Sequence, residues 1–104
     1  MSELTYDELD NRLRAIRSEL VKGDLTDITV EHPGYLSILF GEREYHAGYQ
    51  FDDDINDTGL FEVYDFTDGY QGEVYKLIKP DNFSFDYVAQ WLASAISSDM
   101  ARGN

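Results

Sequence analysis

The sequence predicts an α+β fold in two layers: an N-terminal helix, a five-stranded antiparallel meander sheet and a C-terminal helix, with both helices on one face of the sheet. Three observations lead to this prediction. The two terminal segments carry apolar residues at helical spacing, whereas the segments between them alternate apolar and polar residues with a period of two. Turn residues separate the alternating segments at short intervals, which favours hairpins between neighbouring strands. Two apolar helix stripes are most simply buried against a single sheet face.

Length and composition indicate one domain with enough apolar residues for a core. The chain has 104 residues, so 1–104 is expected to form a single domain. Leu, Ile, Val and Phe make up about a quarter of it, above the level of roughly 20% expected of disordered chains. Cysteine is absent, which excludes disulfides, thiolate metal ligands and cysteine nucleophiles. Because the sequence shows neither a signal peptide nor a long apolar run, we expect a cytoplasmic protein.

The first element is predicted to be a helix that begins after Thr5 and stops at Gly23. Thr5 is a favourable N-cap, and Glu8 three residues later completes a capping box. Acidic side chains lead and basic ones follow, which matches the helix dipole. Glycine is typical of the position just after a helix. The stripe expected to face the core consists of Leu9, Leu13, Ile16 and Leu20.

Five strands are predicted between the helices. The expected strands are 27–31, 35–40, 45–51, 60–66 and 74–79. The expected reversals are His32–Tyr35, Gly41–Arg43, the polar loop 52–59 and Thr67–Gly72. In the third strand, one face is expected to carry Tyr45, Ala47, Tyr49 and Phe51, and the opposite face His46 and Gln50.

The last element is predicted to be a helix that follows a break at Pro80–Asn82. Ser84 is the expected N-cap of this helix, because serine can accept a hydrogen bond from the first turn. Residues 97–104 are small and polar, so we expect them to form a frayed tail. The stripe expected to face the core consists of Phe85, Val88, Leu92 and Ile96.

Negative charge is the outlier of the composition, and it is concentrated in the middle of the chain. The chain carries 21 acidic and 8 basic residues, for a net charge of -13 at pH 7. Residues 1–22 are nearly neutral, whereas residues 24–73 contain thirteen acids and a single base, Arg43. Such a surface repels phosphates, which disfavours nucleic acids and anionic membranes, and it attracts a basic partner. Solubility alone and adaptation to high salt are the alternative explanations.

One acidic segment has the spacing of a calcium loop. Oxygen-bearing side chains stand at the first, third, fifth and twelfth positions from Asp54, with Gly59 at the sixth, as in loops whose oxygens converge on one ion. The alternative is a polar hairpin loop, which collects the same residue types. The candidate ligands are Asp54, Asn56, Thr58 and Asp65.

No motif in the sequence supports catalysis, so we expect that the protein is not an enzyme and that it needs no cofactor. His32 lies in a predicted turn, and His46 is expected on the surface of a strand. The serines at 94, 97 and 98 lack the glycine elbow of a nucleophile, and Gly69–Gly72 lacks the spacing of a phosphate-binding loop.

The preferred hypothesis is an acidic, non-catalytic binding module that docks a basic protein. It would be an inhibitor or immunity-type protein or a mimic of nucleic-acid charge, acting as a monomer or weak dimer. Tyrosines interleaved with acids suit an arginine-rich partner. The alternatives are a small-ligand or calcium-binding domain that uses residues 52–65, and an accessory protein whose charge only confers solubility. The expected partner-binding residues, on an exposed face of the sheet, are Tyr45, Tyr49, Asp52, Asp53, Asp54, Asp57, Glu62, Tyr64, Asp65 and Asp68.

Overall fold

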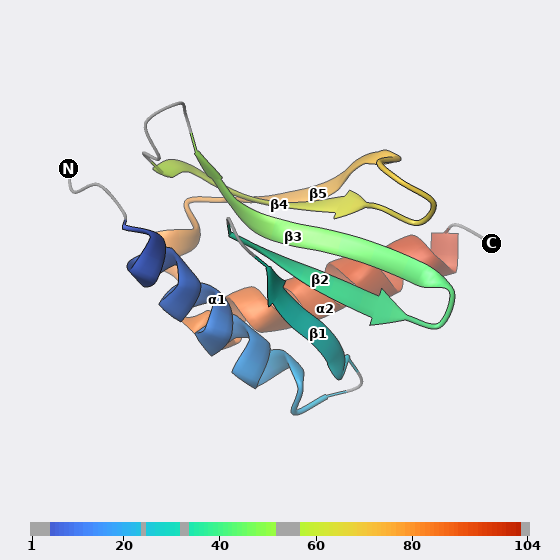
Figure 1. Ribbon diagram of the computed structural model, residues 1–104, viewed down its shortest axis with the longest axis horizontal. Coiled ribbons are helices and arrows are strands. Elements are labelled where there is room, and N and C mark those ends of the chain that lie inside the picture. Colours follow the sequence, from blue (N-terminus) through green and yellow to red (C-terminus); the bar gives the residue numbers. More distant parts are fainter. Residues whose placement is uncertain (1–4, 24, 32–33, 52–56, 103–104) are drawn as a thin grey trace.

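Five strands pair antiparallel in the order in which they occur in the chain, as the turn spacing predicts (Figure 1). The computed structural model describes residues 5–23, 25–31, 34–51 and 57–102. The predicted order of helix, meander sheet and helix is confirmed. The elements are α1 (Tyr6–Leu20), β1 (Asp27–Glu31), β2 (Tyr35–Phe40), β3 (Arg43–Phe51), β4 (Asp57–Asp65), β5 (Gly72–Ile78), the 3-10 turn η1 (Pro80–Asn82) and α2 (Phe85–Arg102).

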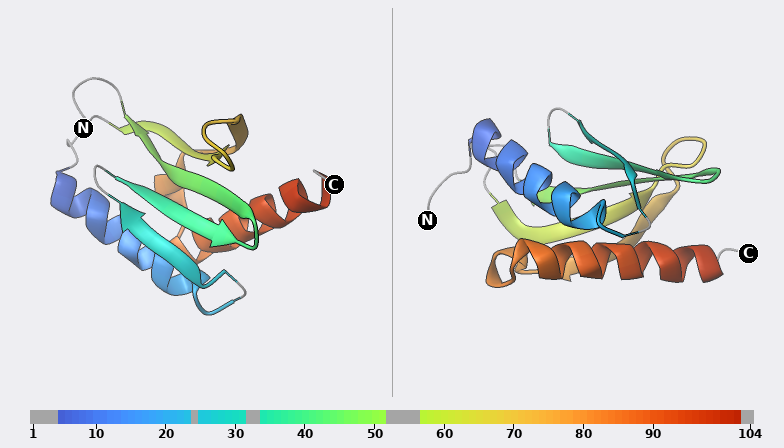
Figure 2. Two further views of the ribbon diagram at one scale, coloured as in Figure 1. Left: turned by 45° about the vertical axis from the view of Figure 1, so that its right-hand side comes forward. Right: turned by 90° about the horizontal axis from the view of Figure 1, so that it is seen from below.

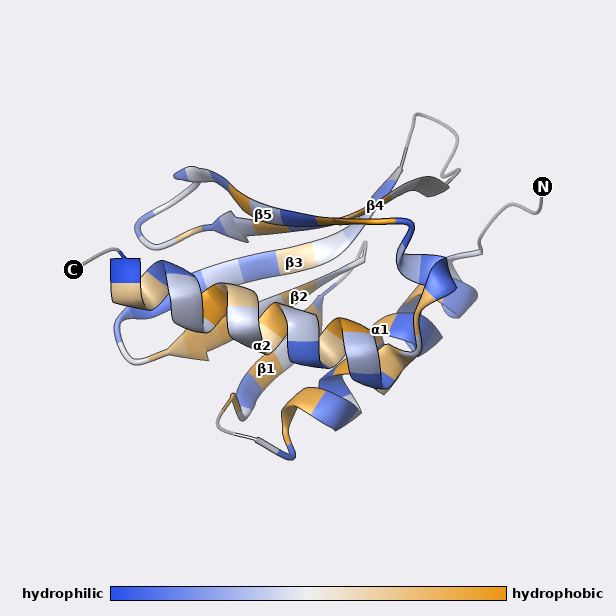
Figure 3. Ribbon diagram, turned by 180° about the vertical axis from the view of Figure 1, so that it is seen from behind, coloured by the Kyte–Doolittle hydropathy of each residue, from blue (hydrophilic) through white to orange (hydrophobic). Residues whose placement is uncertain are grey.

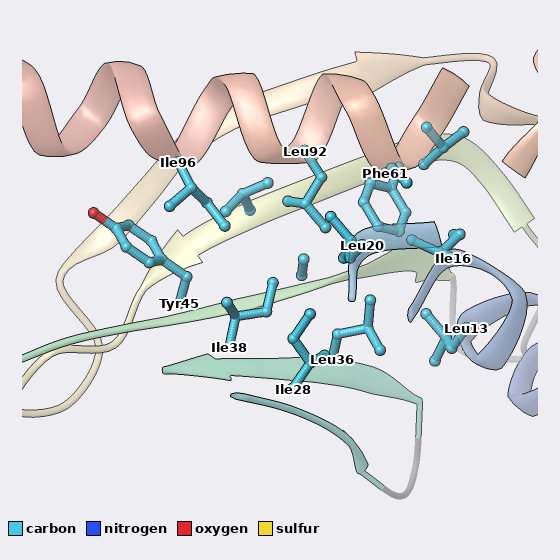
Figure 4. Close-up of a cluster of buried hydrophobic side chains, with 14 of the residues drawn as sticks. Leu13, Ile16, Leu20, Ile28, Leu36, Ile38, Tyr45, Phe61, Leu92 and Ile96 are labelled. Atoms are coloured by element: carbon cyan, nitrogen blue, oxygen red, sulfur yellow. The ribbon is translucent and has the colours of Figure 1, made fainter. Parts of the chain in front are cut away.

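A single hydrophobic core lies between the sheet and the two helices, which contact each other and the sheet (Figure 2). The α1 stripe predicted from the sequence is buried, and side chains from α2 and from all five strands meet it (Figure 4). Apolar and polar residues recur along α2, as expected of a helix with one buried side (Figure 3). The central residues of the core include Leu13, Ile16, Leu36, Ile38, Tyr45, Phe61, Val63, Leu92 and Ile96.

The start of α1 is fixed by the predicted capping box. The Thr5 hydroxyl accepts from the backbone N–H of Glu8 at 3.0 Å, and the Glu8 carboxylate accepts from the backbone N–H of Thr5 at 3.4 Å. Further along the helix, the guanidinium Nε of Arg17 donates to the backbone carbonyl of Ile28 at 2.7 Å. This hydrogen bond ties α1 to β1, which is an edge strand of the sheet.

The strand bounds differ most from the prediction in β4. This strand begins at Asp57, so residues 57–59, which were expected in the loop, are part of the sheet. Asp57 pairs with Phe51 of β3, and the register shifts between Tyr49 and Phe51. The sequence gives no alternation in 57–59, and the extension depends on pairing with β3. Residues 52–56 lie outside the described part of the chain.

Helix α2 continues to Arg102, so the expected fraying is wrong for residues 97–102. The reason is tertiary: Asp99 is bound by side chains from the sheet, and Met100 packs against the core. Residues 103–104 lie outside the described part of the chain. Phe85 was expected in the core but is exposed at the first position of the helix, whereas the small side chains of Ala89 and Ala95 are buried.

Replacing Ser84 by Ala is expected to lower the free energy of unfolding by about 1 kcal/mol. The Ser84 hydroxyl accepts from the backbone N–H of Tyr87 at 3.1 Å, which confirms it as the N-cap. Urea denaturation measures the loss. The matched control is Ser94→Ala, an exposed site within α2 where alanine is the better helix former and no loss is expected. Equal losses in the two variants would contradict the capping role.

Candidate functional site: the outer face of the sheet

We call the side of the sheet that points away from the helices the outer face. Figure 1 views the molecule from this side, with α2 behind the sheet. Strand residues that alternate with the core residues project here, and the pairing of neighbouring strands places them side by side. The outer face therefore contains Glu31 and Tyr35 from the β1–β2 pair, Glu44 and His46 from β3, Glu62 and Tyr64 from β4, and Glu73 and Lys76 from β5.

Aromatic rings from three strands and a turn form a continuous row across this face. His46 lies between Tyr35 and Phe66, with ring centroids 4.7 Å and 3.9 Å apart. Tyr70, an exposed residue in the β4–β5 turn, contacts Phe66 at 5.5 Å and Tyr64 at 5.7 Å. We call these five residues the aromatic row. His46 lies on the face of β3 opposite Tyr45 and Ala47, as expected, but its neighbours leave its side chain only 16% exposed.

Two glutamates accept hydrogen bonds from members of the aromatic row. His46 Nε2 lies 2.6 Å from a carboxylate oxygen of Glu44, and the Tyr64 hydroxyl donates to Glu62 at 3.0 Å. Burial raises the pKa of Tyr64, and the neighbouring Tyr70 adds to this effect, so the Tyr64 hydroxyl keeps its proton as a donor at neutral pH. The His46 ring and the Tyr64 hydroxyl therefore hold the carboxylates of Glu44 and Glu62 in place.

Five basic side chains pair with acids on the helix side of the molecule, in α1, η1, α2 and at the end of β4. Lys76 lies instead on the outer face, as the direct cross-strand partner of Glu62. The ion pairs in the described part of the chain are Arg12–Asp81, Arg14–Asp10, Lys22–Glu19, Arg43–Asp65, Arg43–Asp99 and Arg102–Asp99.

A hollow of about 310 Å³ opens on the outer face above Gly48. A Cβ atom at this position would lie 2.9 Å from the carbonyl oxygen of Gly34 and 3.3 Å from the Cα of Tyr35. Glycine is therefore required where β3 passes the start of β2. The rings beside Gly48 form the walls of the hollow. Its lining includes Tyr35, His46, Gly48, Gln50, Tyr64 and Phe66.

Tyr45 and Tyr49 were expected on the exposed face, and this expectation is wrong. They are 0% and 4% exposed, because they share with Ala47 the side of β3 that faces the core. Figure 4 shows Tyr45 among the core residues Ile38 and Ile96. Neither ring can contact a partner without unfolding the core.

Asp65 also lies on the helix side, at the end of the sheet. Its carboxylate is 3.2 Å from Arg43 Nη2, which is in turn 3.0 Å from Asp99 of α2. The Tyr45 hydroxyl donates to the same oxygen of Asp99 at 2.7 Å. We call Arg43, Tyr45, Asp65 and Asp99 the Arg43 cluster. Asp65 is only 18% exposed and is already paired, so it was wrongly assigned to the exposed surface.

Glu62 and Tyr64 are the two expected binding residues that the structure brings together on the outer face. Asp68 is exposed in the β4–β5 turn, and Asp57 is the first residue of β4. Asp52, Asp53 and Asp54 lie outside the described residues. The sequence analysis missed Tyr35, Glu44, Phe66 and Tyr70 as site residues. The signal that could have found them is the period of two, which places them opposite the apolar residues of their strands or in the adjoining turn.

The proposed set of calcium ligands cannot surround one ion. Thr58 and Asp65 lie seven residues apart in the same extended strand, which separates their Cα atoms by about 23 Å. Asp54 and Asn56 lie outside the described residues. Within the described residues, no cluster of three or more His, Asp or Glu side chains is arranged to hold a metal ion.

Comparison of the chain with family models, with curated proteins and with solved structures gives no significant match. Among the helices of the described residues, none is long and apolar enough to cross a bilayer.

Proposed function

We propose that this protein is a non-catalytic binding module whose outer face docks a basic protein. The observation that supports the proposal most directly is the place of two carboxylates. Glu44 and Glu62 sit beside aromatic rings on the outer face, where Lys76 is the cross-strand neighbour of Glu62, whereas five of the other basic side chains pair with acids on the helix side. A cationic partner could pair with these carboxylates and stack on the rings. Electrostatic attraction would also speed the encounter.

The size of the site favours an inhibitor or immunity-type protein over a mimic of nucleic-acid charge. A mimic would need carboxylates at phosphate spacing over an extended surface. Here the acids and rings are gathered around β3 and β4, in the middle of the sheet. A compact acidic patch with aromatic anchors resembles the hot spots of protein–protein interfaces.

The double variant Glu44→Gln/Glu62→Gln is expected to bind a basic peptide about ten-fold more weakly than the wild type, a loss of about 1.4 kcal/mol. The probe is a fluorescent peptide of alternating arginine and glycine, followed by anisotropy at low salt. The control, Asp10→Asn/Glu19→Gln, removes the same charge from α1, where both acids are ion-paired. We expect this control to change the affinity less than about two-fold, as for other exposed pairs.

Salt separates docking from a role in solubility alone. Raising the salt concentration from about 0.05 M to about 0.5 M shortens the screening length and should weaken binding of the peptide strongly. If the peptide does not bind at low salt, or if the two double variants lose affinity equally, the negative charge serves solubility and the proposed function is wrong.

A further inference from the structure

We propose that the hollow above Gly48 receives one arginine side chain of the basic partner. This inference rests on the proposed function, because it specifies what the outer face recognises. It concerns the hollow and its immediate walls rather than the charge of the whole surface.

The size of the hollow suits a single side chain. Sites that enclose a whole small ligand have volumes of about 300–1,000 Å³, so a hollow of about 310 Å³ is at the lower end of that range. Gly34, Tyr35 and Gly48 belong to its lining, and the backbone of Gly34 and Tyr35 lies so close to Gly48 that no side chain fits at that position. The hollow is open at the outer face, so a group from outside the chain can enter it.

The walls are ring faces, and a carboxylate is hydrogen-bonded to one of these rings. Tyr35, His46, Tyr64 and Phe66 line the hollow. Glu62 is the direct cross-strand partner of Gly48, so the two residues lie side by side on β3 and β4. The hydrogen bond from the Tyr64 hydroxyl holds the Glu62 carboxylate next to a ring of the lining. A group that enters here would meet aromatic surface, with the Glu62 carboxylate beside Tyr64 at the edge and Lys76 on the far side of Glu62.

A guanidinium matches this combination better than an ammonium. It is planar, so it can stack on a ring, and it is more weakly hydrated than an ammonium, so it enters an apolar hollow more readily. Its fork of N–H donors can also pair with a carboxylate such as Glu62. Lysine is a compact, strongly hydrated charge and would be favoured at the open, acidic rim instead.

The test is a titration of the ¹⁵N-labelled protein with three small probes: the N-acetyl methylamides of arginine, lysine and citrulline. Citrulline has nearly the same shape as arginine but carries no charge. The arginine probe is expected to shift the amide signals of Tyr35, Gly48 and Glu62, and to bind at least five-fold more tightly than either of the other probes. Glu62→Gln, which keeps an acceptor for Tyr64, should remove this preference for arginine, whereas Glu19→Gln on α1 should retain it.

The outcomes distinguish this inference from the proposed function. If the arginine and lysine probes bind the wild type equally and the shifts avoid Gly48, while the arginine–glycine peptide still binds, the outer face docks basic proteins but the hollow does not select arginine. If the citrulline probe binds as well as the arginine probe, the hollow takes a neutral planar group and the inference is wrong. If neither the arginine probe nor the arginine–glycine peptide binds, the proposed function fails as well.

Discussion

Replacing Arg43 by Ala is expected to lower the free energy of unfolding by about 2–3 kcal/mol, because it leaves the partly buried carboxylate of Asp65 without its cation and leaves Asp99 with Arg102 alone. Arg43 Nη2 lies 3.2 Å from Asp65 and 3.0 Å from Asp99, whose side chains are 18% and 15% exposed. The expected value lies between those for exposed and fully buried ion pairs. Denaturation in urea at neutral pH measures the loss.

The control for this prediction is Arg14→Ala, which removes an arginine from the exposed i,i+4 pair with Asp10. We expect that variant to lose less than about 0.5 kcal/mol. The loss in Arg43→Ala should also be accompanied by faster amide exchange in residues 97–102, because the cluster binds the last turns of α2 to the sheet. A loss no larger than that of Arg14→Ala would mean that the cluster does not hold the helix.

The protein is expected to lose about 2–3 kcal/mol of stability through Tyr45 alone as the pH rises from about 10 to about 12. Burial raises the pKa of Tyr45 to about 12, and the hydrogen bond to Asp99 adds to this effect. The folded state therefore binds the phenolic proton more tightly than the unfolded state, whose tyrosine has its usual pKa of about 10. The stabilisation is complete below pH 10 and disappears as the pH passes through the folded value.

Tyr45→Phe isolates this contribution from those of the other tyrosines. At pH 7 the variant should be less stable by about 1 kcal/mol, because the hydrogen bond to Asp99 is lost. Above pH 10 the difference between the two proteins should shrink and then reverse, since phenylalanine has no proton to lose. Urea denaturation at a series of alkaline pH values measures both curves. Parallel curves up to pH 12 would show that Tyr45 does not titrate in the way its burial implies.

Local patterns predicted the elements of the fold because each pattern depends on residues close together in the chain. The capping box of Thr5 and Glu8 and the cap at Ser84 each lie within one turn. The strands were recognisable from alternation and from their turn residues. The two largest errors in the predicted bounds occur where contacts distant in the sequence decide the structure. Residues 57–59 become strand by pairing with β3, and α2 continues to Arg102 with Asp99 bound by Arg43, 56 residues earlier.

The candidate site was predicted less well than the fold. The tyrosines were assigned to the site by residue type, and not by the face of the sheet on which the period of two places them. The period of two already places Tyr45 and Tyr49 with Ala47, on the core side, and leaves His46 opposite them. The sequence could not show the hollow beside Gly48. Its shape depends on how closely Gly34 and Tyr35 of the neighbouring strand approach Gly48. The pairing of Arg43 with Asp65 and Asp99 was likewise invisible in the sequence.

The contact between Arg17 and Ile28 influences how copies of this protein can aggregate. Fibrils grow when an exposed edge strand of one sheet pairs with a strand of the next molecule, and continued growth needs two exposed edge strands in each molecule. At the edge strand β1, the Arg17 guanidinium already donates a hydrogen bond to the carbonyl of Ile28, so an incoming strand would have to displace Arg17 to pair there. Two molecules can therefore join through their β5 edges, but adding a third molecule needs the β1 edge and is hindered there.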